Sequence, residues 1–284
     1  MRILLSSVLF LQQMTSMINK TTSVLLASAL ALVFAGCKGK KGQVNEDVPV
    51  PSFETANVAG MVQDTVTFTA ADGLEVRGVR YQADSGAPVI VLCHQARFNN
   101  YEYAEIAPKL VAMGFTCLAI DQRSGDAMGT HTNATATNAK AKGLETGYQT
   151  SLPDIRAAVD YAAALTGNPV ILWGSSYSAT LVMQVAMESD KVRAAVGFSP
   201  ILKFDSGDSA ADIFAKYQGK PIFITSTEKE GVPIAKGLKH LGDDVLYQYY
   251  PETKGTHGSK ALWSSDPASA DYWAEVGAWL QKHK

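Results

Sequence analysis

A serine in the segment Gly174-Ser175-Ser176-Tyr177-Ser178 lies where an apolar run meets a helical pattern. The run Val170-Ile171-Leu172-Trp173 is long enough for a buried strand, and helical spacing of apolar residues continues from Tyr177. At a sharp strand-to-helix turn, a serine hydroxyl projects above the sheet and the first helix amides can receive negative charge. The pattern predicts Ser176 as a nucleophile, although Ser178 replaces the last glycine of G-x-S-x-G. The alternative is that Ser176 caps the helix, as serines often do.

A serine hydroxyl needs a base to take its proton, and that base needs a third group to fix its tautomer. In a sheet with such a turn, the order along the chain is nucleophile, acid, histidine. The five histidines are His94, His131, His240, His257 and His283. Only His257 both follows Ser176 and lies in a loop after a late apolar run, so it is the predicted base. The alternative is a solvated loop histidine.

The acid is expected just beyond the apolar run Pro221-Ile222-Phe223-Ile224-Thr225. Two glutamates follow this run closely, Glu228 and Glu230. The reach across the strand tips favours the later one, so Glu230 is the predicted acid and Glu228 is the alternative. Both also fit the pattern of solvated loop charges.

The rest of the chain alternates between strand and helix patterns that would position these residues. Period-two patterns at 65–69 and 74–81 surround Ala71-Asp72-Gly73 and predict a β-hairpin. Further strands are predicted at 88–93, 115–120, 192–198, 221–225 and 245–250, and helices at 101–113, 154–165, 234–241 and 268–283. This order predicts the α/β class, with a mostly parallel, doubly wound sheet and an N-terminal antiparallel hairpin. In such a sheet, chemistry collects at the carboxyl ends of the strands.

A long polar stretch, residues 126–153, is rich in Thr, Asn, Ala and Gly. Loops longer than ~12–15 residues without secondary structure are usually functional or disordered. Because this one leaves a strand tip beside the predicted site, it is expected to border the substrate pocket. The alternative is an exposed flap.

The front of the chain has the pattern of an export signal. In residues 1–36, Lys20 precedes an apolar run from Val24 to Ala35, which is shorter than the ~20 residues that span a bilayer. The run ends in Phe34-Ala35-Gly36-Cys37, which resembles the lipobox of bacterial lipoproteins, where the cysteine thiol receives a diacylglycerol. The resemblance implies lipidation at Cys37. The alternatives are a simple cleaved signal and an N-terminal membrane helix.

Residues 37–57 are predicted to be a flexible tether, because large apolar side chains are few and Pro49-Val50-Pro51 interrupts them. The folded domain is predicted at 58–284. Acyl chains on Cys37 would anchor it to a membrane of the bacterial cell envelope, with the domain in the periplasm or outside the cell.

Composition limits the other function classes. The chain is 46% hydrophobic and 18% charged, with a net charge of -2, so it has a large core and no basic face for nucleic acid. Cys93 and Cys117 each lie in an apolar run and are predicted to be small buried residues rather than a bridge or reactive thiols. No metal-ligand spacing or phosphate-binding glycine loop is present, so no metal or cofactor is expected.

The order and spacing of these motifs resemble the α/β-hydrolase superfamily, and within it the dienelactone-hydrolase-like branch. The resemblance covers roughly 58–284 and rests on the serine turn, the Glu230 segment and three short motifs: Val91-Leu92-Cys93-His94-Gln95, Ala119-Ile120-Asp121-Gln122-Arg123-Ser124-Gly125 and Gly255-Thr256-His257-Gly258. Ser178 and Gln95 stand where many members have glycine. Ser176 replaces the cysteine nucleophile of true dienelactone hydrolases, which favours simple ester hydrolysis over lactone chemistry.

The resemblance also implies roles for the surrounding residues. The backbone amides of Gln95 and Tyr177 would form the oxyanion hole, where each fixed donor is worth ~10²–10³ in rate. His94 would have a structural role, hydrogen-bonding across the loop behind that hole, and the alternative is a role in proton transfer. Asp121 and Arg123 would form a pair that fixes their loop.

These observations together predict a lipid-anchored serine hydrolase of small-molecule carboxylic esters. It would act through Ser176, His257 and Glu230 and an acyl-enzyme. One alternative is a peptidase of the same superfamily, disfavoured because the stretch before the domain is too short for a propeller-sized domain. The other is a binding lipoprotein with a decayed site, disfavoured because all three residue types are present in order. Fold alone leaves the acyl and alcohol groups and the oligomeric state open.

Overall fold

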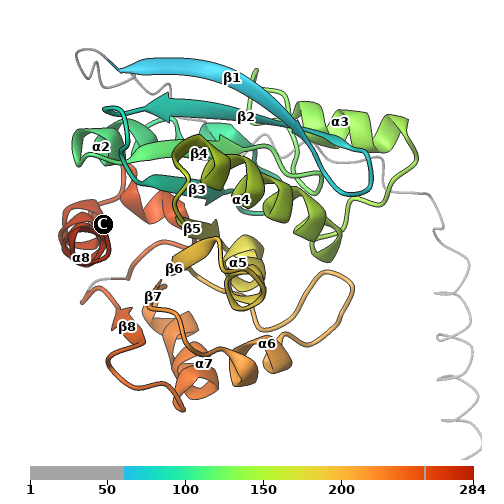
Figure 1. The fold of residues 1–284 in the computed structure, drawn as a ribbon. Helices are drawn as coiled ribbons and strands as arrows, with labels where there is room; N and C mark the ends of the chain where they lie inside the picture. The colour runs from blue at the N-terminus through green and yellow to red at the C-terminus, as the bar shows by residue number, and fades with distance from the viewer. Residues whose placement is uncertain (1–60, 253) are drawn as a thin grey trace, which may run out of the picture. The chain divides into compact units, whose positions relative to one another are not determined.

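The computed structural model describes residues 61–252 and 254–284, which form an eight-stranded sheet flanked by helices (Figure 1). The export signal and tether expected at 1–57, including Cys37, lie outside these residues. The strands are β1 Val62–Thr69, β2 Glu75–Gln82, β3 Val89–Cys93, β4 Thr116–Ile120, β5 Val170–Ser175, β6 Val192–Phe198, β7 Ile222–Thr225 and β8 Leu246–Tyr249. The helices are α2 Ile106–Ala112, α3 Ala134–Ala141, α4 Leu152–Thr166, α5 Tyr177–Glu188, α6 Ala211–Lys216, α7 Glu228–Leu238 and α8 Ser269–Lys282, with short 3-10 helices η1 Asn100–Tyr103, η2 Gln149–Ser151 and η3 Ser259–Leu262.

The strand order is β1-β2-β4-β3-β5-β6-β7-β8. Strand β2 pairs antiparallel with both β1 and β4, and all the other pairs are parallel. The predicted doubly wound sheet with an N-terminal antiparallel hairpin is therefore confirmed. Because β3 and β5 to β8 run the same way, the loops that follow them meet at one edge of the sheet.

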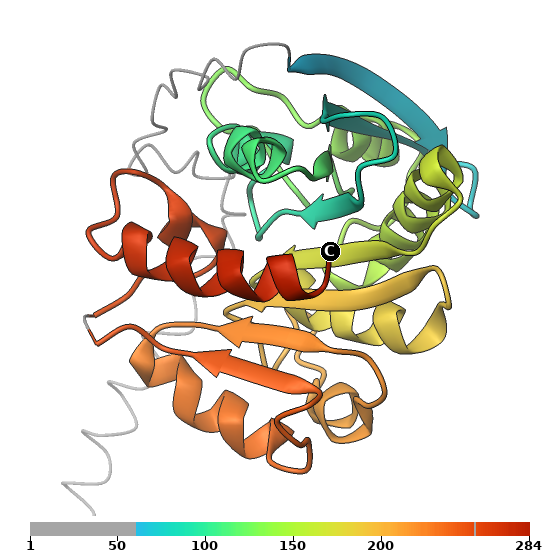
Figure 2. The same cartoon turned by 60° about the vertical axis from the view of Figure 1, so that its left-hand side comes forward.

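Helices cover both faces of the sheet, as predicted for strands that read as continuous apolar runs. Every residue of β3, β4 and β5 is buried. One face packs against α4, α5, α6 and α7, and the other against α2 and α8. Figure 2 shows α8 lying across that second face. Helix α5 buries nearly all of its residues, which is why its sequence is apolar almost all round.

Two helices begin elsewhere than the apolar spacing predicted. Helix α7 was expected from 234 but begins at Glu228, because Thr227 and Glu230 form a capping box at its start. The helix expected over 101–113 begins only at Ile106, after the separate turn η1, where the side chain of Asn99 accepts the amide of Tyr101. Both starts have local signals that periodicity of apolar residues does not detect.

The cysteines behave as predicted. Cys93 and Cys117 are free and fully buried, and their side chains belong to the apolar cores on opposite faces of the sheet. Burial raises the pKa of both thiols far above the usual range.

Among the described residues, no helix combines the length and the apolar character needed to cross a membrane.

Strand β5 approaches helix α5 so closely that a side chain cannot fit at Gly174. A Cβ atom there would lie 2.4 Å from the carbonyl carbon and oxygen of Ser178 and 2.5 Å from the amide of Ala179. These are backbone atoms of the first helical turn, so relief would require moving the whole helix.

We therefore expect Gly174→Ala to lower the free energy of unfolding by ~3 kcal/mol or more, since the overpacked atoms are backbone. Gly147→Ala is the control, because a Cβ there meets only the Asp205 carboxylate at 3.6 Å. Its effect should stay within ~0.5 kcal/mol. Urea denaturation measures both variants, and equal losses would contradict the proposed steric limit at Gly174.

Candidate active site

Ser176 lies at the turn between β5 and α5 in a strained backbone conformation. Its φ of 58° and ψ of -123° lie in a region that residues other than glycine rarely adopt. Its amide donates to the carbonyl of Phe198 at 2.7 Å, which ties the turn to β6. The side chain makes no capping hydrogen bond, so the helix-cap alternative does not describe Ser176.

The structure brings Ser176, His257 and Glu230 together, although they are far apart in the sequence. His257 Nε2 lies 2.8 Å from Ser176 Oγ, and His257 Nδ1 lies 2.5 Å from Glu230 Oε1. The alternative acid, Glu228, is exposed. The geometry is that of a hydroxyl, a base and an acid that orients the base.

The two carboxylate oxygens of Glu230 have different hydrogen-bond partners. Oε1 contacts His257, whereas Oε2 accepts hydrogen bonds from the Ser199 hydroxyl at 2.9 Å and from the Thr227 amide at 3.2 Å. Partial burial alone would raise the pKa of Glu230, but the hydrogen bond and charge of His257, followed by the bonds from Ser199 and Thr227, lower it to about 2. Glu230 is therefore held ionised across the neutral pH range.

Two serines at neighbouring strand tips hold the loop that carries His257. Ser199 Oγ accepts the amide of Gly258 at 3.0 Å, and Ser175 Oγ accepts the amide of Ser259 at 2.8 Å. Gly258 has a φ of +75°, and a Cβ there would lie 2.7 Å from Ser175 Oγ. Only glycine fits this position, which explains the Gly-Thr-His-Gly motif in part.

Gln95 does not provide the free amide that the family resemblance implied for an oxyanion hole. Its N–H donates to Glu102 Oε2 at 2.7 Å, and both residues are buried. The amide of Tyr177 is the first of helix α5 and has no upstream acceptor within the helix. Across the described part of the chain, the next amide in the loop, that of Ala96, donates to no protein acceptor. Sequence patterns do not show this contact, because it forms only once the chain folds back through η1 and brings Glu102 to the Gln95 amide.

His94 has the structural role that the resemblance implied. Its Nε2 accepts the Gln122 amide at 2.9 Å and its Nδ1 contacts the Gln95 carbonyl at 2.8 Å. Burial lowers the pKa of His94 to about 4, so the ring remains neutral. Ser178 Oγ donates to the His94 carbonyl at 2.6 Å and accepts from Gln122 Nε2 at 2.9 Å. A glycine at position 178 would lose this link between helix α5 and the His94 loop.

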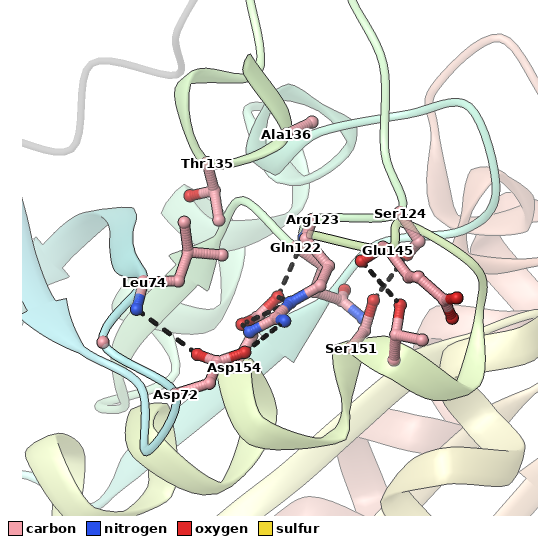
Figure 3. A network of polar contacts seen from close by, with 12 residues as sticks. Asp72, Leu74, Gln122, Arg123, Ser124, Thr135, Ala136, Glu145, Ser151 and Asp154 are labelled. Atoms are coloured by element: carbon pink, nitrogen blue, oxygen red, sulfur yellow. Dashed lines mark hydrogen bonds and ion pairs between the residues drawn. The ribbon is translucent and has the colours of Figure 1, made fainter. Parts of the chain in front are cut away.

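The expected ion pair between Arg123 and Asp121 does not form. The Arg123 guanidinium contacts Asp154 at 2.6 Å and Asp72 at 2.5 Å, which joins the β1–β2 turn to the start of α4 (Figure 3). Asp121 instead accepts the backbone and side-chain amides of Asn100 at 2.9 and 2.6 Å. The two acids that take Arg123 come from distant segments, so local sequence could not identify them.

The carboxyl-terminal end of the stretch 126–153 packs against the start of helix α5. The Tyr148 ring stacks on that of Tyr177 with centroids 4.4 Å apart, and the Tyr148 amide contacts the Asp205 carboxylate at 3.3 Å. Helix α3, which apolar periodicity did not predict, packs instead beside β2, where Thr135 Oγ1 accepts the Arg77 amide at 2.9 Å.

Among residues 61–252 and 254–284, no group of three or more His, Cys, Asp or Glu side chains could hold a metal ion.

Comparisons with known proteins identify the family and the fold. A model of the dienelactone hydrolase family matches residues 76–283. An esterase of Pyrococcus furiosus is similar in structure, with a TM-score of 0.61 and 15% identity over 78% of this chain and 91% of that chain. An acylaminoacyl peptidase of Pyrococcus horikoshii has a TM-score of 0.59 and 16% identity over 79% of this chain and 42% of that chain.

The esterase domain of a Rhodothermus marinus protein is also similar, with a TM-score of 0.54 and 17% identity over 78% of this chain and 99% of that chain. At these identities the structural likeness shows the fold alone, which is the α/β-hydrolase fold. A search of curated proteins with this sequence finds no match.

Ser199 contacts both Glu230 and Gly258, so Ser199→Ala should loosen the acid and the histidine loop together. We expect the rate at which a fluorophosphonate probe labels Ser176 to fall ~10-fold, since one or two hydrogen bonds of ~1 kcal/mol are lost. The control is Ser206→Ala, an exposed serine of the same inter-strand segment that contacts Gln149 and Asp208. Equal labelling rates in the two variants would exclude this positioning role for Ser199.

Proposed function

This chain belongs to the dienelactone hydrolase family, and we propose that it is a serine hydrolase that cleaves carboxylic esters. The observation that carries the proposal is the continuous relay from Glu230 through His257 to Ser176, with contacts of 2.5 and 2.8 Å. The same relay argues against a decayed site, because a protein that only binds has no need for it. Membership of the family makes the chain a hydrolase of the α/β-hydrolase superfamily.

In the proposed reaction, Ser176 Oγ attacks the ester carbonyl carbon while His257 Nε2 takes the hydroxyl proton. The carbonyl π electrons move to oxygen, which forms a tetrahedral oxyanion. Glu230, ionised because its pKa is about 2, stabilises the imidazolium and keeps its Nδ1 proton in place. The imidazolium then gives its Nε2 proton to the departing alcohol, which leaves an acyl-enzyme. Water, activated by the same nitrogen, releases the acid and restores Ser176.

The oxyanion would be held by the backbone amides of Tyr177 and Ala96. Tyr177 follows the nucleophile and opens helix α5, whose N-terminus favours negative charge. Ala96 replaces Gln95 in this role because the Gln95 amide already donates to Glu102. Donors that are fixed before the charge develops contribute most to this kind of stabilisation.

We also propose that the domain is tethered to a membrane through lipid on Cys37. The support is the sequence alone: the apolar run, the residues Phe34-Ala35-Gly36 before the cysteine, and the lysine-containing tether after it. This arrangement would place the enzyme at the envelope surface, where it would meet small esters from outside the cytoplasm.

The function is tested with a purified domain lacking residues 1–37. We expect Ser176→Ala and His257→Ala each to abolish fluorophosphonate labelling and to lower kcat on short-chain nitrophenyl esters by ~10⁴-fold or more. His240→Ala is the control, because His240 is exposed and its ring bonds to the Tyr217 carbonyl rather than to Ser176 or Glu230. A folded wild type that is neither labelled nor active on esters would refute the proposal, and faster cleavage of acyl-peptides than of esters would favour the peptidase.

The anchor is tested in a bacterial host fed an alkyne analogue of palmitate. We expect the full chain to carry the label and to sediment with membranes, whereas Cys37→Ser should lose the label and become soluble. The control is Cys93→Ser, since Cys93 is buried in the domain core and should leave labelling unchanged wherever the protein folds. Label retained by Cys37→Ser would rule out lipidation at that residue.

A further inference from the structure

A buried carboxylate outside the triad lies between the two loops that the reaction needs. We propose that Glu102 is a positioning residue, which fixes the oxyanion loop and the histidine loop relative to Ser176. The inference deepens the proposed ester hydrolysis and rests on it. Glu102 lies in the 3-10 helix η1 and is 0% exposed.

Glu102 contacts one partner from each side. Its Oε2 accepts the Gln95 amide at 2.7 Å, and its Oε1 accepts the Ser175 hydroxyl at 2.7 Å. Ser175 Oγ also accepts the Ser259 amide at 2.8 Å, so this hydroxyl donates to Glu102 and accepts from the histidine loop. Both carboxylate oxygens therefore act as acceptors, and a single side chain links Gln95 to Ser259 through Ser175.

The link acts on the oxyanion loop, which follows β3 and contains Gln95 and Ala96, through the two peptide groups that flank Gln95. The amide of Gln95 is held by Glu102, and its carbonyl accepts from His94 Nδ1 at 2.8 Å and from the Phe98 amide at 3.3 Å. Because a trans peptide is planar, fixing the Gln95 carbonyl also fixes the direction of the Ala96 N–H on the opposite side. Removing Glu102 would free one end of this arrangement.

On the other side, the link acts on the loop of the base. Ser259 is two residues beyond His257, and its hydroxyl accepts Trp173 Nε1 at 3.0 Å while its amide donates to Ser175. Ser175 directly precedes the nucleophile. A shift of Ser175 would therefore alter the nucleophile and the base at the same time.

Glu102 is itself held rigidly. Its backbone carbonyl accepts Trp263 Nε1 at 2.9 Å, and the adjacent Tyr103 donates its hydroxyl to the Cys93 carbonyl at 2.7 Å. Burial raises the pKa of Glu102 to about 7, against the bonds from Gln95 and Ser175 and the charges of Lys260 and His257. The charged form, which accepts both hydrogen bonds most strongly, is therefore lost as the pH falls through about 7.

The test compares Glu102→Gln with Glu105→Gln in the purified domain. Glutamine keeps the shape but removes the negative charge, and its NH2 group cannot accept the hydrogen of Ser175 or of Gln95, so the link is weakened. Glu105 is a matched control, because it is also a buried carboxylate of this segment and accepts a backbone amide, that of Ser264, at 2.7 Å, without contacting the Gln95 or Ser175 links.

We expect Glu102→Gln to lower kcat on a nitrophenyl ester ~10–100-fold with KM within ~3-fold, since a displaced donor acts mainly in the transition state. Glu105→Gln should keep kcat within ~3-fold whatever its thermal stability. Affinity for a trifluoromethyl ketone, which forms a tetrahedral adduct with the serine, should fall in Glu102→Gln by the same factor as kcat. A purely structural role would lower stability without this parallel.

The pair of loops gives a second route to the same test. Ser175→Ala removes the link but keeps the carboxylate, and we expect it to lower kcat to a similar extent. It replaces Glu102→Gln as the test if that variant does not fold. In the double variant, kcat should fall no further than in the worse single variant. If the wild type is active and kcat is unchanged in Glu102→Gln or in Ser175→Ala, the positioning role of Glu102 is wrong, but the proposed ester hydrolysis stands. A folded wild type without ester turnover would overturn the proposed function as well.

Discussion

The site depends on how closely strand β5 packs against helix α5. Gly174 leaves no room for a Cβ against the Ser178 backbone, and the chain must turn within a single residue, Ser176, whose φ is 58°. That turn points the hydroxyl toward His257 and leaves the first amide of the helix directed to the same space. Strain at a functional residue persists only when its surroundings over-determine it, and here the Phe198 carbonyl and the Ser178 hydroxyl do so.

Around that turn, small hydroxyl residues at neighbouring strand tips connect loops that lie far apart in the sequence. Ser199 joins the acid to the histidine loop, and Ser175 joins the histidine loop to Glu102. A serine can do this because its hydroxyl donates one hydrogen bond and accepts others at the same atom. The parallel strands set the spacing between these tips, so the geometry of the site follows from the strand order of the sheet.

Local sequence patterns predicted the sheet, most helices and the grouping of Ser176, Glu230 and His257 at one edge, because apolar periodicity and loop order are local properties. The start of α7 was not predicted, although Thr227 and Glu230 have the sequence pattern of a capping box, because apolar periodicity does not detect such a pattern. The partners of Arg123 and the donor lost at Gln95 could not be read from the sequence. Asp154 lies 31 residues from Arg123, and Ser175 lies 73 residues from Glu102. Such contacts exist only after the strands have been placed.

Glu230 closes the first turn of helix α7 with one oxygen and orients His257 with the other. The ends of helices fray more readily than their centres, and such local openings cost less free energy than unfolding of the whole domain. Each fraying event at this end withdraws the acid from the relay while the sheet stays intact. Opening of this one helical turn would therefore inactivate the site while the sheet is still folded.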